Sequence, residues 1–134
     1  MIAFDTNVLI YACDRSDSRR QQIAIDLIAD SRDGVLLWQV ACEFVAASRK
    51  LSAQGFAATD AWNRLTEFLT LLPLILPTAG VLEHGRRLHA THGVSFWDAL
   101  ILAACAEAGV ETLYSEDLPG LHPIGALQVV NPFK

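Results

Sequence analysis

The opening of the chain constrains its fold more than any other stretch. Ile2–Phe4 is a short apolar run, typical of a strand buried on both faces of a parallel sheet. Three small polar residues, Asp5-Thr6-Asn7, end this run before a second apolar run begins at Val8. Because ligands bind at the carboxyl ends of strands in open α/β sheets, Asp5 lies where chemistry is usually done. The alternative is that Asp5 only caps the next helix, a position that Asp favours.

Apolar strand-like runs alternate with helical patterns along the chain. We expect strands at residues 2–4, 35–38, 73–77, 111–115 and 128–130. We expect helices at residues 8–13, 18–29, 39–51, 59–72, 79–92 and 96–108, with Ser16 or Ser18 capping the second and a Pro/Gly-rich loop at 118–123. This alternation predicts an α/β fold in which helices cover both faces of a mostly parallel sheet. The 134 residues fit one domain, 1–134.

The composition of the chain bears on whether the protein enters a membrane or binds nucleic acid. Hydrophobic residues make up 52% of the chain, but no apolar run approaches the roughly 20 residues that span a bilayer. No basic segment precedes an apolar leader, so we expect a cytoplasmic protein without membrane contact. The formal net charge of −5 does not by itself indicate a nucleic-acid-binding protein.

The cysteines and histidines do not indicate a metal site. An odd number of widely spaced cysteines, without a C-x-x-C pair, favours reduced core residues: Cys13, Cys42 and Cys105. His84 is close in sequence to two other histidines, but only His89 and His92 share a helix face. A metal site needs three or four convergent ligands, so a histidine site is disfavoured.

Glu43 is an acid without a local partner. It lies within the apolar stripe of the predicted helix 39–51, which is formed by Val40, Phe44, Ala47 and Leu51. The residues three and four positions after Glu43 are alanines, so no Lys or Arg on the following helix turn forms an ion pair with it. Since an unpaired carboxylate facing a core is costly, either a distant residue satisfies Glu43 or this position lines a polar cleft.

Asp98 is the lone early acid of the apolar helix at residues 96–108. One interpretation is a capping box with Ser95, since the two residues are three positions apart. The other is that the head of this buried helix places the Asp98 carboxylate at the edge of the sheet.

Glu116 and Asp117 follow the fourth strand as Asp5 follows the first, and either can be the functional acid. If the first and fourth strands are neighbours at a topological switch point, Asp5 and Asp117 flank one crevice. Glu43 and Asp98, at helix starts facing the same edge, can close that crevice.

A cluster of four carboxylates indicates cation chemistry. Like charges in one cleft repel each other, which raises their pKa values unless cations are bound. All-oxygen acidic sites suit Mg²⁺ or Mn²⁺, and such sites serve phosphoryl hydrolysis. The chain lacks the Gly-rich phosphate loops and the G-x-S-x-G motif of other enzyme classes.

Four blocks of this sequence resemble the signature blocks of the PIN domain family, and more narrowly the VapC-type toxins of bacterial toxin–antitoxin pairs. The similarity covers the whole chain in order. The blocks are FDTNVLI at residues 4–10, QVACEF at 39–44, SFWDALI at 95–101 and LYSEDL at 113–118.

The resemblance implies a three-layer sandwich with the strand order 3-2-1-4-5. It also implies a Mg²⁺- or Mn²⁺-dependent endoribonuclease, a homodimer, and inhibition by a cognate protein antitoxin. Asp5, Glu43 and Asp98 match the metal ligands, and Asp117 matches a fourth acid. Polar positions that orient the carboxylates or the attacking water are matched by Thr6, Asn7 and Ser115.

Basic and aromatic side chains are candidates for contacts with RNA, although surface charge and core packing are the commoner explanations. The basic candidates are Arg15, Arg19, Arg20, Arg49, Lys50, Arg86 and Arg87. Trp38 and Trp97 lie beside predicted site residues and either stack on bases or, as we rather expect, pack in the core.

The helix at residues 59–72 carries a stripe of large apolar side chains, preceded by Phe56: Trp62, Leu65, Leu69 and Leu72. This is more apolar material than one helix face needs, so we predict a groove or dimer surface between this helix and helix 39–51. Burial within one subunit fits the pattern equally well.

Two rival functions remain open from the sequence. One is a PIN-like module that binds RNA or protein without cutting it. The other is a metal-dependent nuclease or phosphohydrolase that acts on a different substrate.

Overall fold

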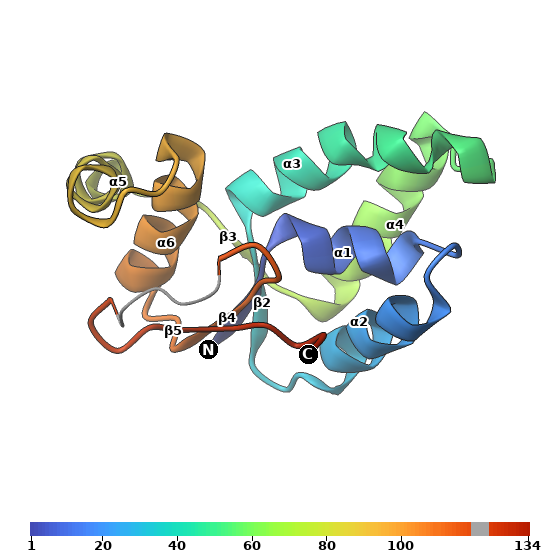
Figure 1. Ribbon diagram of the computed structural model, residues 1–134, viewed down its shortest axis with the longest axis horizontal. Coiled ribbons are helices and arrows are strands. Elements are labelled where there is room, and N and C mark those ends of the chain that lie inside the picture. Colours follow the sequence, from blue (N-terminus) through green and yellow to red (C-terminus); the bar gives the residue numbers. More distant parts are fainter. Residues whose placement is uncertain (119–123) are drawn as a thin grey trace.

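A computed structural model describes residues 1–118 and 124–134 of the chain (Figure 1). The strands are β1 (Ile2–Phe4), β2 (Gly34–Leu37), β3 (Leu74–Ile75), β4 (Thr112–Tyr114) and β5 (Gln128–Val130). The helices are α1 (Thr6–Cys13), α2 (Ser18–Asp30), α3 (Trp38–Ala47), the 3₁₀ helix η1 (Ser48–Gln54), α4 (Ala58–Leu71), α5 (Ala79–His92) and α6 (Phe96–Ala108). The loop expected at 118–123 lies, from residue 119 on, outside the described residues.

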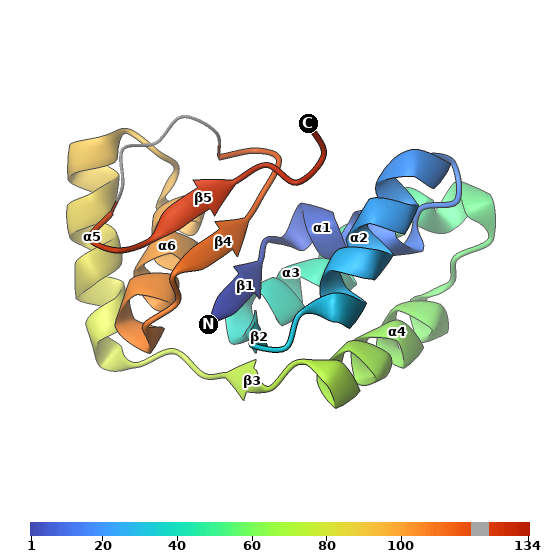
Figure 2. The ribbon, with the colours of Figure 1, turned by 90° about the horizontal axis from the view of Figure 1, so that it is seen from below.

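The five strands form one parallel sheet in the order β3-β2-β1-β4-β5, as predicted. Ala3 of β1 pairs with Val35 of β2 on one side and with Leu113 of β4 on the other. Helices α1 to α4 lie on one side of the sheet, and α5 with α6 on the other (Figures 1 and 2). The chain therefore crosses to the second face between β3 and β4, which creates the switch point beside β1.

The central strands are apolar because both of their faces are covered. Phe4, Leu36 and Leu113 are fully buried, whereas the edge strand β5 is partly exposed. Local signals fix the helix ends where they are strong. Ser95 caps α6, and Gly109 ends it with φ 78°, a conformation that favours glycine. No helix in the described part of the chain is long and apolar enough to cross a membrane.

Several helix boundaries differ from the prediction; α1, for example, begins at Thr6 and not at residue 8. The cap of α2 is Asp17, not Ser16 or Ser18, because its carboxylate accepts a hydrogen bond from the Arg20 amide at 3.1 Å. The third helix begins one residue earlier than expected, at Trp38, and tightens into η1 at Ser48.

Several apolar side chains predicted to be buried are exposed. Helix α4 buries Ala61, Leu65 and Phe68, and Leu72 is buried at its end, but Trp62 is 59% and Leu69 41% exposed. The alternative that the whole apolar stripe is buried within one subunit is therefore wrong. The other exposed residues are Trp38, Trp97 and Cys42. Trp38 and Trp97 start helices at the carboxyl edge of the sheet and are 48% and 65% exposed there.

Candidate functional site

Asp5 lies at the carboxyl end of β1, between the two halves of the sheet. Its amide donates to the Tyr114 carbonyl of β4 at 2.9 Å, which fixes its backbone at the switch point. The side chain is 6% exposed and accepts from Ser115 Oγ at 2.7 Å and from the Thr6 amide at 2.8 Å. Asp5 is also the N-cap of α1, so the capping role and a functional role coexist in one residue.

The surroundings of Asp5 favour its protonated form in the protein without a cation. Burial raises the pKa of the Asp5 carboxyl, and the hydrogen bonds from Ser115 and Thr6 only partly oppose this. The negative charges of Asp98 and Glu43 raise this pKa further. The direction predicted from crowding is thus confirmed for Asp5, although burial is the larger cause, and both Asp98 and Glu43 lie within electrostatic reach of Asp5.

Glu43 is held by neutral donors rather than by a positive charge. Thr6 Oγ1 donates to Glu43 Oε2 at 2.9 Å, so a single threonine contacts both Asp5 and Glu43. Gln39 Nε2 donates to Glu43 Oε1 at 2.9 Å and to the Trp97 carbonyl at 3.0 Å. Gln39 was not among the predicted site residues, although it lies four residues before Glu43 on the same helix face. This amide joins α3 to the first turn of α6.

Asp98 occupies that first turn of α6. Its backbone amide donates to Ser95 Oγ at 3.1 Å, which is the observed helix cap. Because this bond uses the amide, it does not engage the Asp98 carboxylate. The Ser95 half of the predicted capping box is therefore present, and it is compatible with a separate role for the carboxylate.

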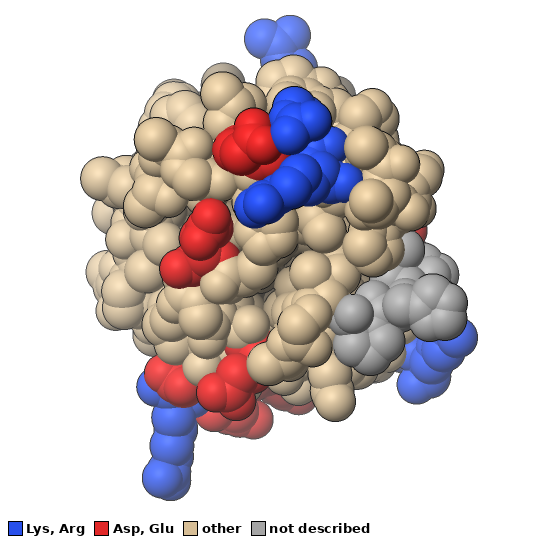
Figure 3. All heavy atoms as spheres, turned by 90° about the vertical axis from the view of Figure 1, so that its left-hand side faces the viewer, with Lys and Arg blue, Asp and Glu red and all other residues tan. Residues whose placement is uncertain are grey.

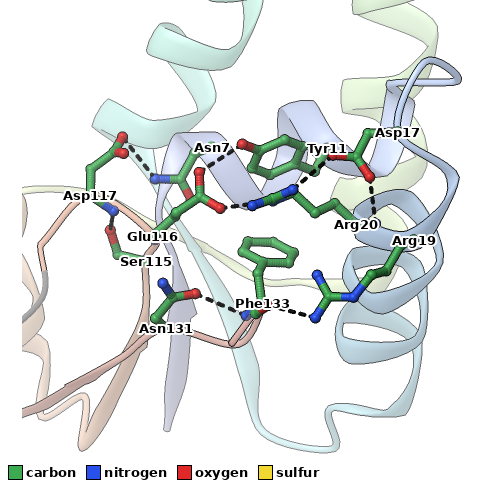
Figure 4. Close-up of polar contacts among 10 residues, drawn as sticks. All are labelled: Asn7, Tyr11, Asp17, Arg19, Arg20, Ser115, Glu116, Asp117, Asn131 and Phe133. Atoms are coloured by element: carbon green, nitrogen blue, oxygen red, sulfur yellow. Dashed lines mark hydrogen bonds and ion pairs between the residues drawn. The ribbon is translucent and has the colours of Figure 1, made fainter.

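The structure separates the two acids that follow β4 (Figure 4). Glu116 bonds to Tyr11 and Arg20, on the side of α1 and α2. Asp117 Oδ2 instead accepts from Asn7 Nδ2 at 3.1 Å, and the Asp117 amide donates to Ser115 Oγ at 3.2 Å. Asn7 and Ser115 thus connect Asp117 to the end of β1, whereas Glu116 is engaged elsewhere.

The donor set suits a hard divalent cation. The four acids offer oxygen ligands, which Mg²⁺ and Mn²⁺ prefer. Within residues 1–118 and 124–134, no ion pair joins Asp5, Glu43, Asp98 or Asp117 to a Lys or Arg. The described residues also contain no group of three His, Cys, Asp or Glu side chains already close enough to hold a metal. The four acids fit such a cation in the chemistry of their oxygen atoms, whereas their spacing in this structure does not yet form a closed set of ligands.

Four of the seven basic candidates for RNA contacts have partners within the chain. Arg19 donates to the Phe133 carbonyl at 2.7 Å, the Arg15 guanidinium donates to the Gln54 carbonyl, and Arg20 and Arg86 form ion pairs. The remaining three candidates, Arg49, Lys50 and Arg87, are exposed, as are Arg15, Arg19 and Arg86. On the side of the molecule where α5 lies, Figure 3 shows a mainly uncharged surface, with basic side chains in small groups beside acidic ones.

An apolar groove adjoins the acids. It has a volume of about 530 Å³ and runs between the start of α3, the β3–α5 connection and α6. Its lining includes Trp38, Gln39, Leu76, Leu82, Trp97 and Leu100. Gln39 belongs both to this groove and to the hydrogen bonds around Glu43, so the groove opens beside the acidic site.

A second groove lies at the other end of α3. It has a volume of about 770 Å³, and α3, η1 and the start of α4 line it. Its lining includes Val45, Arg49, Phe56, Ala61 and Trp62. The groove predicted between these helices is present, although its walls come from their adjoining ends.

Comparisons with known proteins agree with this architecture. A family model of the PIN domain matches residues 2–118. The fold is similar to that of VapC20 from Mycobacterium tuberculosis, a sarcin–ricin-loop-cleaving toxin, with TM-score 0.70 and 20% identity over 87% of this chain and 90% of that one. It is also similar to a chain of VapBC2 from Rickettsia felis, bound to a promoter DNA fragment, with TM-score 0.69 and 18% identity over 98% of each chain.

A third similar structure is FitAcB from Neisseria gonorrhoeae, with TM-score 0.68 and 21% identity over 99% of each chain. No curated protein sequence matches the chain. At these identities the likeness establishes the fold, and the match over residues 2–118 establishes the family.

Proposed function

The chain belongs to the PIN domain family, and from this premise we propose that it is a metal-dependent endoribonuclease, the toxin of a bacterial type II toxin–antitoxin pair. One observation carries the proposal: a buried carboxylate, Asp5, sits at the switch point of the sheet within electrostatic reach of Glu43 and Asp98. Burying and crowding acids without basic partners is costly, and a bound cation offsets that cost. The similar toxin and toxin–antitoxin structures support the toxin assignment.

In this proposal Asp5, Glu43, Asp98 and Asp117 would hold Mg²⁺ or Mn²⁺. When bound, such a cation stabilises charge on the phosphate and lowers the pKa of a bound water. Thr6 orients Asp5 and Glu43 together through its amide and its hydroxyl. Ser115 orients Asp5 on its other oxygen, and Asn7 holds Asp117. These neutral donors fix the carboxylates without neutralising them.

A side-by-side cleavage assay tests the function. We expect the purified protein to cleave RNA when Mn²⁺ or Mg²⁺ is present and to stop when EDTA is added. Structured RNA, single-stranded DNA and a small phosphate ester are offered under the same conditions. Binding of RNA without cleavage at any metal concentration would favour a non-catalytic module, and preference for DNA or the ester would favour another phosphodiester or phosphate substrate.

We further propose that an unpaired RNA base stacks on Trp97, which is 65% exposed and directly precedes Asp98. Stacking on an aromatic side chain contributes about 1–3 kcal/mol per base, or roughly 5- to 150-fold in affinity. Trp97→Ala is therefore expected to raise KM for RNA by about that factor while leaving the Mn²⁺ affinity unchanged. Steady-state kinetics and a Mn²⁺ titration check this, with Trp62→Ala as the control, and an unaltered KM would remove Trp97 from the substrate site.

The partner proposal concerns the groove between α3, η1 and α4. We propose that this groove binds an apolar helix of the antitoxin, because its lining is mainly apolar and includes the exposed Trp62. Trp62→Ser should leave the fold and RNA cleavage intact but weaken inhibition by the antitoxin at least about tenfold, the size of a 1.4 kcal/mol loss. Ile25→Ser, on α2, is the control. Equal inhibition of all three proteins would exclude this groove.

We also propose a homodimer, which light scattering of the isolated protein tests. A monomer at all concentrations used for cleavage would contradict it.

A further inference from the structure

Side chains of the first two helices hold the turn that follows β4 (Figure 4). Tyr11 of α1 donates its hydroxyl to Glu116 Oε1 at 2.7 Å, and Arg20 of α2 donates Nε to Glu116 Oε2 at 2.9 Å. Asp17 accepts from Arg20 Nη1 at 3.0 Å, and the guanidinium lies 5.5 Å from the centre of the Tyr11 ring. We call these four residues, Tyr11, Asp17, Arg20 and Glu116, the Glu116 clamp. Both oxygens of the Glu116 carboxylate are occupied by it.

The clamp differs from an ordinary surface ion pair. The Arg20 and Glu116 side chains are 36% and 23% exposed, and the residues are 96 positions apart in the sequence. A pair inside a network of partly buried hydrogen bonds is more rigid than an isolated surface pair, whose contribution is small. The hydrogen bond to Glu116 raises the pKa of Tyr11 to about 12, so Tyr11 remains a donor at neutral pH.

Asn7 and Ser115, which also contact the predicted site acids, hydrogen-bond to the same turn from the other side. Asn7 Oδ1 accepts from the Glu116 amide at 3.4 Å, while Asn7 Nδ2 donates to Asp117 Oδ2 at 3.1 Å. Ser115 Oγ accepts from the Asp117 amide and donates to Asp5. Since Glu116 and Asp117 are adjacent, fixing the Glu116 side chain toward α2 restricts the direction available to Asp117.

We propose that Arg20 and Tyr11 are positioning residues that hold Glu116 away from the acidic site and thereby present Asp117 to the cation. Released from the clamp, the Glu116 carboxylate would compete with that of Asp117 for the cation. The turn would then be held only by its hydrogen bonds to Asn7 and Ser115. The inference rests on the proposed metal-dependent function. It replaces the expectation that Arg20 contacts RNA, because the structure commits this guanidinium to Glu116 and Asp17.

The test compares Arg20→Met, Glu116→Gln and the double variant with wild type. Each single change is expected to weaken Mn²⁺ binding, measured without RNA, by about 10-fold or more, as outer partners of metal ligands do. The double variant should lose no more than the larger single loss, because both changes break the same contact. Arg86→Met, which breaks an exposed ion pair on α5, is the matched control and should bind Mn²⁺ as wild type does.

A second readout does not depend on the metal. Amide hydrogen exchange of Glu116 and Asp117 should quicken in Arg20→Met, because both amides lie in the anchored turn and donate to side chains, Asn7 Oδ1 and Ser115 Oγ. If Arg20→Met instead weakens RNA binding while leaving Mn²⁺ affinity and both amides unchanged, the proposal is wrong and Arg20 contacts RNA.

Two further outcomes remain decisive. If Arg20→Met does not fold, Tyr11→Phe, which removes one hydrogen bond, takes its place with the same expectations. If wild type itself binds no Mn²⁺, the metal-dependent function fails, and unchanged exchange in the variant would separately overturn the clamp.

Discussion

Replacing Asp5 by asparagine is expected to reduce metal-dependent RNA cleavage at least about 100-fold. Loss of an outer partner of a metal ligand already costs about 10- to 100-fold, and Asp5 would be a ligand itself. The exchange is nearly isosteric, and the asparagine oxygen can still accept the Thr6 amide, so the fold should persist. Single-turnover cleavage at saturating Mn²⁺, with circular dichroism as the check of folding, measures the effect.

Asp26→Asn supplies the control for that experiment. Asp26 is exposed on α2 and bonds to Gln22, so its change should leave cleavage unaffected. Undiminished cleavage by a folded Asp5→Asn protein would remove Asp5 from the catalytic site and reduce it to the cap of α1.

The same substitution should stabilise the protein when no metal is present. The pKa of Asp5 is raised in the folded state, mainly by burial and further by Asp98 and Glu43. The folded state therefore binds more protons than the unfolded state between the unfolded pKa and the folded pKa. Stability falls as pH rises through that interval, and the penalty persists at neutral pH. Asparagine has no such charge, so the metal-free variant should melt higher than wild type at pH 7.

Melting curves with and without Mn²⁺ test this reasoning. A rise of a few degrees is expected, since about 1 kcal/mol corresponds to roughly 2–8 °C in domains near this size. The difference should shrink below the ordinary Asp pKa, near 3.8, where Asp5 is protonated in both states. Wild type should also gain more from Mn²⁺ than the variant does. A variant that melts lower without metal and responds equally to Mn²⁺ would show that Asp5 is purely structural.

Much of the fold was predictable because its signals are local. Helix α6 was placed to the residue, since Ser95 and Gly109 mark its two ends and the stretch between Asp98 and Glu107 is apolar. The short strands β1 and β5 were placed equally well from their apolar runs and flanking polar residues. Burial was less predictable: on α4, Trp62 fits the apolar period but faces away from the sheet.

The sequence by itself determined the strand-to-helix alternation and the place of Asp5 at a strand end, because short-range periodicity and caps specify both. Only the tertiary structure shows that the two acids after β4 point to different partners. Glu116 meets Arg20 across 96 positions and Asp117 meets Asn7 across 110, and no local pattern encodes such pairings. It also decided that Trp38 and Trp97 are exposed, because burial depends on whether a second layer of the fold covers a helix end.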